Sequence, residues 1–298
     1  MSDLEVAGSL FQRWLNDAHA RHFRLEGGDL ALEDETSLAL AVHHLIGGTD
    51  DAEWLATRYR IEDLLTEAIP ASFVLWVPAG DQLPGGEPPT SEFIEHVRKA
   101  ATRLGPNERS YVSLPINLRL RKNADSGGVV SATGGLNPHW ARFTERVRGQ
   151  YDLDSTQLHR LPESEEHLEA LIDEIVERAK TLETGQVTEI DTINAWTVQR
   201  LPEQSGVTVI GWPPRDLGDI GLAVRRGFRK VLAAAVPSLR SRDADLRALV
   251  VIGPYSRVEQ EGATTAMRGY DPALYSGIDF ICLVADGLVK PLIQPRTV

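Results

Sequence analysis

The chain has 298 residues, of which 42% are hydrophobic, 25% are charged and only one is a cysteine. This composition excludes disordered, collagen-like and disulfide-stapled proteins, and a single thiol cannot build a multi-cysteine zinc site. The formal net charge of −12 argues against an overall electrostatic attraction to nucleic acid or to an anionic membrane.

The first 70 residues (1–70) are predicted to form an acidic helical unit. Apolar residues recur at helical spacing in three stretches, 10–15, 38–46 and 50–69. The same 70 residues contain 5 basic and 14 acidic side chains, a balance of −9. We therefore expect a small unit of helices that carries much of the negative charge of the chain.

Residues 71–184 are predicted to form an α+β part. Alternating apolar and polar residues over 110–122 predict a strand with one buried face, and the turn residues that follow make 129–133 the returning strand of a hairpin. Ser164 is a suitable N-cap for an acidic helix that ends this part, and residues 163–192 contain 10 acidic and 2 basic side chains. The other elements that we expect here are strands at 72–77 and 151–161 and helices at 91–104 and 138–147.

Residues 185–298 are predicted to form a mixed-sheet α/β part, so the fold class of the whole chain is mixed α+β and α/β. Two nearly continuous apolar runs are typical of strands covered on both faces, and Asp286 with Gly287 forms the turn signal of a closing hairpin. In chain order we expect strands at 187–201 and 207–212, a helix at 217–236, a strand at 246–253, a helix at 259–275 and strands at 278–284 and 288–293.

The element order of the last hundred residues resembles the core of restriction-endonuclease-like folds. Such nucleases need an acid at a strand start and an acid-x-lysine triplet on the paired strand, because two carboxylates bind the metal and the lysine orients water. Asp279 and Lys290 supply the first acid and the lysine, whereas Leu288 occupies the place of the second acid. The resemblance rests on element order alone, and it implies such a core without its catalytic motif.

Signatures of nucleophilic and nucleotide chemistry are missing from the sequence. The residues around Ser131 lack the glycines of a nucleophile elbow, and Gly211, Gly218 and Gly221 do not have the spacing of a phosphate-binding loop. Cys282 lies within an apolar strand, which favours a small buried core residue over a reactive thiolate.

Two pairs of side chains are candidate metal ligands. His19 and His22 are three residues apart on a predicted helix and share a face. Asp152 and Asp154 are two residues apart on a predicted strand, which puts both carboxylates on one face, where they are suited to hold a magnesium ion. Surface histidines and a solvated strand face explain the same spacings. We therefore predict no cofactor and keep a divalent metal as an alternative.

The strongest binding signal in the sequence is basic. Three strips of basic side chains are candidate nucleic-acid ligands: Arg225, Arg226, Arg229 and Lys230 on the helix at 217–236, Arg119, Arg121 and Lys122 on the strand at 110–122, and Arg142, Arg146 and Arg148 on and just after the helix at 138–147. The strips either meet as one phosphate-binding face or pair with the acidic helices. His139 and Arg142 also lie beside a helix start, which is a candidate anion site or an ordinary capped helix.

Two functions of different classes fit these observations. The first is a non-catalytic or catalytically degenerate subunit of a nucleic-acid-processing or defence-type assembly, which binds a protein partner or a second copy of itself and contacts phosphate through its arginines. The alternative is a metal-dependent enzyme acting on a phosphorylated substrate or on nucleic acid, with Asp152, Asp154 and His139 as candidate catalytic residues. We expect a cytoplasmic protein without membrane contact, because neither a secretory signal nor an apolar run of the ~18 residues needed to span a bilayer is present.

Overall fold

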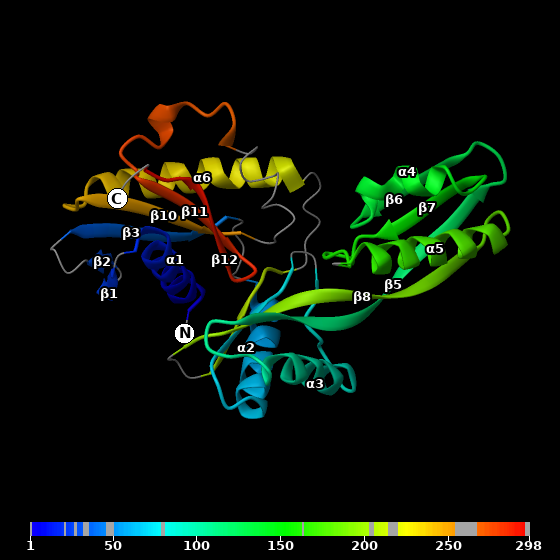
Figure 1. Ribbon diagram of the computed structural model, residues 1–298, viewed down its shortest axis with the longest axis horizontal. Coiled ribbons are helices and arrows are strands. Elements are labelled where there is room, and N and C mark those ends of the chain that lie inside the picture. The colour runs from blue at the N-terminus through cyan, green and yellow to red at the C-terminus, as the bar shows by residue number, and fades with distance from the viewer. Residues whose placement is uncertain are drawn as a thin grey trace. The chain divides into compact units, whose positions relative to one another are not determined.

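Six helices and two mixed β-sheets make up the part of the chain that the computed structural model describes (Figure 1). The chain divides into two units: unit 1 contains residues 1–110 and 197–298, and unit 2 contains residues 111–196. The boundaries drawn from the sequence, after residues 70 and 184, differ from these, because the chain enters unit 2 within strand β5 (Arg109–Ala124) and leaves it within strand β8 (Val187–Arg200). The described residues are 2–20, 22–26, 29–31, 36–45, 51–78, 81–162, 164–202, 206–213, 220–253 and 267–295.

The first sheet of unit 1 is built around three parallel strands, β3, β10 and β11, with antiparallel strands on both sides. Helices α1 (Asp3–His19) and α6 (Ile220–Arg240) cover its two faces. In sheet order the strands are β1 (Arg24–Glu26), β2 (Asp29–Ala31), β3 (Ser37–His44), β10 (Leu246–Ile252), β11 (Phe280–Ala285) and β12 (Leu288–Ile293).

Both faces of the central strands are buried, which explains their continuous apolar sequence. Val250 packs in the core on the α1 side of the sheet, Val251 packs on the α6 side, and both are fully buried. Cys282 on β11 also lies in the core, and its burial raises the pKa of the thiol, so the prediction of an inert core cysteine is confirmed. The predicted strands at 246–253 and 278–284 and the closing hairpin at Asp286–Gly287 are confirmed as well.

The helix predicted at 38–46 is wrong, because residues 37–44 form strand β3, which pairs with β10 in parallel. Leu38 and Leu40 pack on the α1 side of the sheet, whereas Ala39 packs on the α6 side. A strand that is covered on both faces has no alternation of apolar and polar residues, so its sequence has the same composition as a buried helix. The first 70 residues are therefore not an all-helical unit.

A smaller layer of unit 1 contains helices α2 (Ala52–Ala68) and α3 (Pro89–Ala101) and strand β4 (Phe73–Trp76). Strand β4 pairs in parallel with β9 (Val207–Ile210) and antiparallel with the end of β8. Side chains of α2 accept hydrogen bonds from the main chain of β9: Val207 N donates to Thr66 Oγ1 (3.0 Å) and Val209 N donates to Glu62 Oε1 (2.7 Å). Four sequence predictions are thereby confirmed, namely helices at 50–69 and 91–104 and strands at 72–77 and 207–212.

Unit 2 places its helices on one face of a sheet whose strand order is β6-β7-β5-β8. A 3₁₀ turn η1 and helix α4 connect β6 to β7, and helix α5 precedes β8. The predicted alternation of β5 is confirmed, because Leu118 and Leu120 are buried under the helices while Arg119 and Arg121 are exposed on the opposite face. The elements are β6 (Val129–Gly134), η1 (Asn137–His139), α4 (Trp140–Thr144), β7 (Gln150–Ser155) and α5 (Glu165–Thr181), the last capped by Ser164 as predicted.

The hairpin predicted between β5 and 129–133 is wrong. Strand β7 lies between β5 and β6, pairing antiparallel with β5 and parallel with β6. A parallel pair needs a crossover, which η1 and α4 supply. Gly127 and Gly128, both at positive φ, mark where the chain turns after β5. A turn signal in the sequence does not determine which strand then pairs with β5.

Two helices predicted from the sequence differ in extent from the structure. The helix at 138–147 is replaced by η1 and the short helix α4, which ends at Thr144. The helix at 259–275 falls mostly outside the described residues, and its described end contains the 3₁₀ turn η2 (Pro272–Leu274). The predicted helix at 217–236 is confirmed as α6.

Candidate functional site

Helix α6 buries one face and exposes a basic one. Val224 and Phe228 are fully buried against the first sheet, which leaves Arg226, Arg229 and Lys230 exposed. The helix has 21 residues and no acidic side chain. A Cβ at position 227 would lie 2.3 Å from the Leu45 carbonyl oxygen, so a glycine there allows the close approach of α6 to the end of β3.

Tyr270 holds two of the arginines of α6 in place. The guanidinium carbons of Arg225 and Arg229 lie 5.2 and 5.4 Å from the centre of its ring. The Tyr270 hydroxyl donates a hydrogen bond to the Arg225 carbonyl, and Arg225 Nη1 donates to the Arg268 carbonyl (3.2 Å). Cation–π contacts of this kind orient a guanidinium without neutralising its charge.

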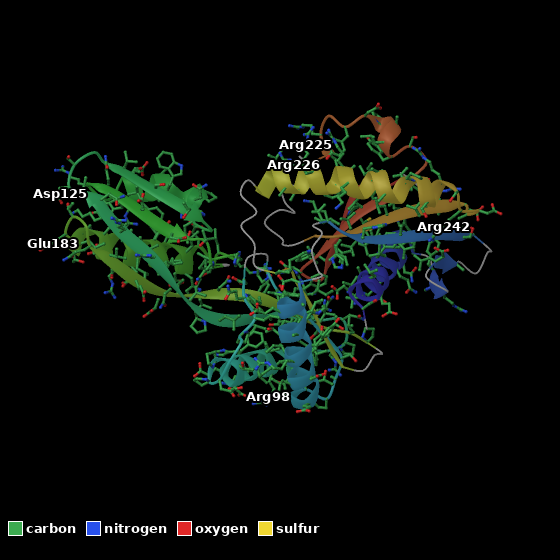
Figure 2. All side chains as sticks on the ribbon, turned by 180° about the vertical axis from the view of Figure 1, so that it is seen from behind. Arg98, Asp125, Glu183, Arg225, Arg226 and Arg242 are labelled. Carbon is green, nitrogen blue, oxygen red and sulfur yellow. The ribbon has the colours of Figure 1, made fainter. Side chains whose placement is uncertain are left out.

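The exposed cations of α6 have no carboxylate partner among the described residues. Throughout the described part of the chain, no carboxylate forms an ion pair with Arg226, Arg229 or Lys230. Figure 2 shows Arg225 and Arg226 on the outer side of α6. Helix α5 of unit 2 differs, because Arg178 pairs with Glu174 (2.7 Å) within the same helix. The structure therefore brings all four basic residues predicted on this helix to one region.

Two members of the third predicted strip, Arg142 and Arg146, pair with the acidic helix α5. Arg142 on α4 forms ion pairs with Glu165 (2.7 Å) and Glu169 (2.8 Å), and Arg146 forms one with Asp173 (2.5 Å). These contacts match the alternative in which basic strips meet acidic helices inside the chain.

Arg119, Arg121, Asp152 and Asp154 share the exposed face of the sheet in unit 2. Arg119 is the cross-strand neighbour of Asp154, and Arg121 is that of Asp152, so the charge on this face is mixed. Asp152 accepts a hydrogen bond from Asn123 Nδ2 (2.6 Å), and Asp154 accepts one from Thr156 N (3.0 Å). The two carboxylates share a face as the spacing predicts. A polar hollow of about 590 Å³ is lined by Asp154, Arg119 and neighbours that include Asn117 and Glu189.

The prediction that His19 and His22 share a helix face is wrong, because α1 ends at His19 and His22 lies beyond it. The ring of His19 packs edge-on against Trp14 and Phe280, with centroid distances of 6.0 and 5.9 Å. His22 is exposed and lines a hollow of about 670 Å³ beside α1. His139 ends η1 before α4, a helix of only five residues. Among the described residues, no three His, Cys, Asp or Glu side chains form a group suited to a metal ion.

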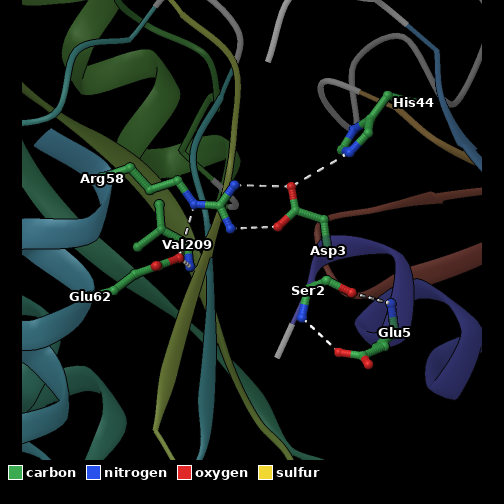
Figure 3. A network of polar contacts seen from close by, with 7 residues as sticks. All are labelled: Ser2, Asp3, Glu5, His44, Arg58, Glu62 and Val209. Atoms are coloured by element: carbon green, nitrogen blue, oxygen red, sulfur yellow. Dashed lines mark hydrogen bonds and ion pairs between the residues drawn. The ribbon is translucent and has the colours of Figure 1, made fainter. Parts of the chain in front are cut away.

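A buried ionic network in unit 1 joins residues that are far apart in the sequence (Figure 3). Arg58 Nη1 and Nη2 donate to the two carboxylate oxygens of Asp3 (3.1 and 2.5 Å), and Arg58 Nε donates to Glu62 Oε1 (2.9 Å). The Nε2 atom of His44 lies 3.6 Å from the same Asp3 carboxylate. The network ties α1 to α2 and, because Glu62 also binds Val209 N, to β9.

One sequence signal points to this network. Arg58 stands in the apolar stripe of α2 with Trp54, Ile61 and Leu65, and a charged residue at such a position needs a partner. Burial lowers the pKa of Arg58, but hydrogen bonds and charge from Asp3 and Glu62 outweigh burial and raise it. The partner Asp3 is 55 residues away in the sequence, so spacing alone does not reveal it.

The two histidines at the end of β3 have lowered pKa values. Burial lowers the pKa of His43. Burial also lowers the pKa of His44, Asp3 raises it, and Arg58 and His43 lower it, with a net shift below the ordinary value of 6.5. Both side chains are therefore neutral in the folded protein at neutral pH.

We expect the free energy of unfolding to fall as the pH is lowered from about 7 to about 5.5. The unfolded chain takes up protons at His43 and His44 near pH 6.5, whereas the folded chain takes them up only at lower pH. Urea denaturation across this range measures the slope, which should be flatter in the double variant His43→Gln, His44→Gln. Equal slopes for the wild type and the double variant would contradict the assignment.

No protein-family model, curated protein or solved structure matches this chain. In the helices that the structure describes, none combines the length and apolar character required for crossing a bilayer.

Proposed function

We propose that the protein is a subunit of a nucleic-acid-processing or defence-type assembly and that the basic face of α6 contacts the phosphate backbone. One observation carries the proposal: Arg225, Arg226, Arg229 and Lys230 lie on an acid-free helix, without a carboxylate partner among the described residues. Guanidinium groups suit phosphate because their planar fork binds it bidentately. Cations held close together repel one another. A cluster of cations without carboxylate partners among the described residues therefore favours binding of an anionic ligand.

The net charge of −12 is compatible with local attraction of phosphate. At physiological ionic strength the Debye length is about 8 Å, so acids farther from α6 are largely screened. Arg226 and Lys230 are four residues apart, about 6 Å along the helix axis at 1.5 Å per residue. A phosphate group bound between them would therefore lie within one Debye length of both charges.

We propose binding without cleavage. Asp279, the first acid in the resemblance to restriction-endonuclease-like cores, accepts a hydrogen bond from Arg247 N (2.8 Å) and so serves the packing of β10 against β11. Leu288 stands where the second acid is needed. The proposal also places the protein in the cytoplasm, where a single buried thiol stays reduced.

Charge reversal on α6 tests the proposal. We expect the full chain to bind a fluorescently labelled 20-base-pair DNA duplex at about 50 mM salt, and the variant Arg226→Glu, Arg229→Glu to bind at least tenfold more weakly, because two phosphate contacts become repulsive. Fluorescence anisotropy measures the affinity. A single-stranded DNA and an RNA duplex of the same length identify the preferred form.

The matched control reverses two cations on another helix of the same unit. Arg98 and Lys99 on α3 are exposed and already paired with Glu95, so Arg98→Glu, Lys99→Glu makes the same change in net charge away from α6. Its affinity should stay within threefold of wild type. The proposal is wrong if no probe binds the wild type, or if the control weakens binding as much as the α6 variant does.

A further inference from the structure

We propose that strand β6 of unit 2 pairs edge to edge with β6 of a second copy of this chain. In the sheet order β6 stands at the end, with β7 on one side and no strand of the described chain on the other. Open strand edges are templates for pairing, and proteins usually protect them. Among the described strands, the other edges are protected, whereas that of β6 is not.

The edges in unit 1 are protected in three ways. Strand β12 contains Lys290 and Pro291, which oppose further pairing. Strand β1 has only three residues, of which the first and last are charged. Strand β9 is covered, since Thr66 and Glu62 of α2 accept hydrogen bonds from its main chain.

The outer edge of β8 within unit 2 is protected by charge. Glu189 and Asp191 are exposed on this strand, and charged side chains discourage edge pairing. Strand β6 has no such feature, because its sequence from 129 to 134 contains neither a charged residue nor a proline.

The main chain of residues 129–133 in β6 has hydrogen-bonding groups left for a partner strand. Within the described residues, one further hydrogen bond reaches the main chain of 129–133 besides those that pair β6 with β7. Ser155 Oγ donates it to the Thr133 carbonyl, and Ser155 belongs to β7, on the inner side of β6. Val129, Ser131 and Thr133 expose their side chains on the uncovered face, and Val129 is 54% exposed. Valine and threonine also have high strand propensity.

A second copy of β6 is the partner that fits this edge. Two neutral strands of identical sequence pair antiparallel about a twofold axis without placing like charges opposite each other. Helix α4 packs over β6, and its Trp140 is 49% exposed. Arg142 and Arg146 nearby are already neutralised by α5.

Sedimentation equilibrium of the full chain from about 1 to 100 µM tests the pairing. We expect a dimer for the wild type and at least tenfold weaker dimerisation for Ser131→Lys, Thr133→Lys, because lysines then face lysines across the twofold axis. The control Ile193→Lys changes an exposed residue of β8 on the same sheet and should keep the wild-type dimer. Circular dichroism verifies that each variant is folded.

Hydrogen exchange provides a test that needs no variant. Amide protection of residues 129–134 should rise with wild-type concentration, while that of β8 stays constant. A monomer at 100 µM, unchanged dimerisation of the lysine variant, or loss of the dimer in the Ile193→Lys variant alone would overturn the proposal. None of these outcomes bears on α6, so the proposed phosphate-binding function is tested separately.

Discussion

Replacing Arg58 by methionine is expected to lower the free energy of unfolding by about 3–5 kcal/mol, because removal of one partner leaves a buried charge without compensation. Asp3 is 6% exposed and has Arg58 as its bidentate partner. The substitution also removes the partner of Glu62, which still binds Val209 N. Urea denaturation followed by far-ultraviolet circular dichroism measures the loss.

The double variant Asp3→Asn, Arg58→Met separates the ion pair from the packing of the side chains. Replacement of both partners of a buried ion pair is often close to neutral, so the double variant should be more stable than the sum of the two single losses predicts. Arg98→Met, which breaks an exposed pair with Glu95, should leave the urea midpoint at the wild-type value. A loss below about 1 kcal/mol for Arg58→Met would contradict a structural role for the network.

Phe280→Ala is expected to lower the free energy of unfolding by about 3–5 kcal/mol, the range for deleting a buried phenyl ring. Phe280 is fully buried on β11, and its ring contacts Phe11 (6.1 Å), Trp14 (6.4 Å) and His19 (5.9 Å) between centroids. This loss of stability combines the lost free energy of transferring the phenyl ring from water into the core with the cost of the cavity left under α1. The same urea measurement checks it.

The exposed Leu274 provides the control for the core substitution. It is 41% exposed, so Leu274→Ala should change stability by no more than about 0.5 kcal/mol. A small effect of Phe280→Ala would show that α1 does not cover this face of the sheet as described.

Elements with a local signal were predicted well from the sequence. The Ser164 cap fixes the start of α5, and Asp286–Gly287 fixes the turn between β11 and β12. The errors come from long-range packing. Strand β3 carries apolar residues on both faces because α1 and α6 cover it, and β6 pairs with β7 because a crossover returns the chain there.

The candidate site was predicted in part. The spacing of Arg225, Arg226 and Arg229 places them together on a helix whose exposed face the structure leaves basic. The ring that orients two of the arginines, Tyr270, lies more than 40 residues later, and no local pattern connects it with them. Likewise, the ion pairs that occupy Arg142 depend on how α5 packs over α4 in unit 2.

If the cations of α6 neutralise phosphates, as we propose, the salt dependence of binding shows it most directly. For duplex DNA, the logarithm of the binding constant falls with the logarithm of salt concentration by about 0.9 for each phosphate neutralised. If Arg226 and Arg229 each neutralise one phosphate, the slope for Arg226→Glu, Arg229→Glu should be shallower than that of wild type by about 1.8. An identical slope for the two proteins would contradict the claim.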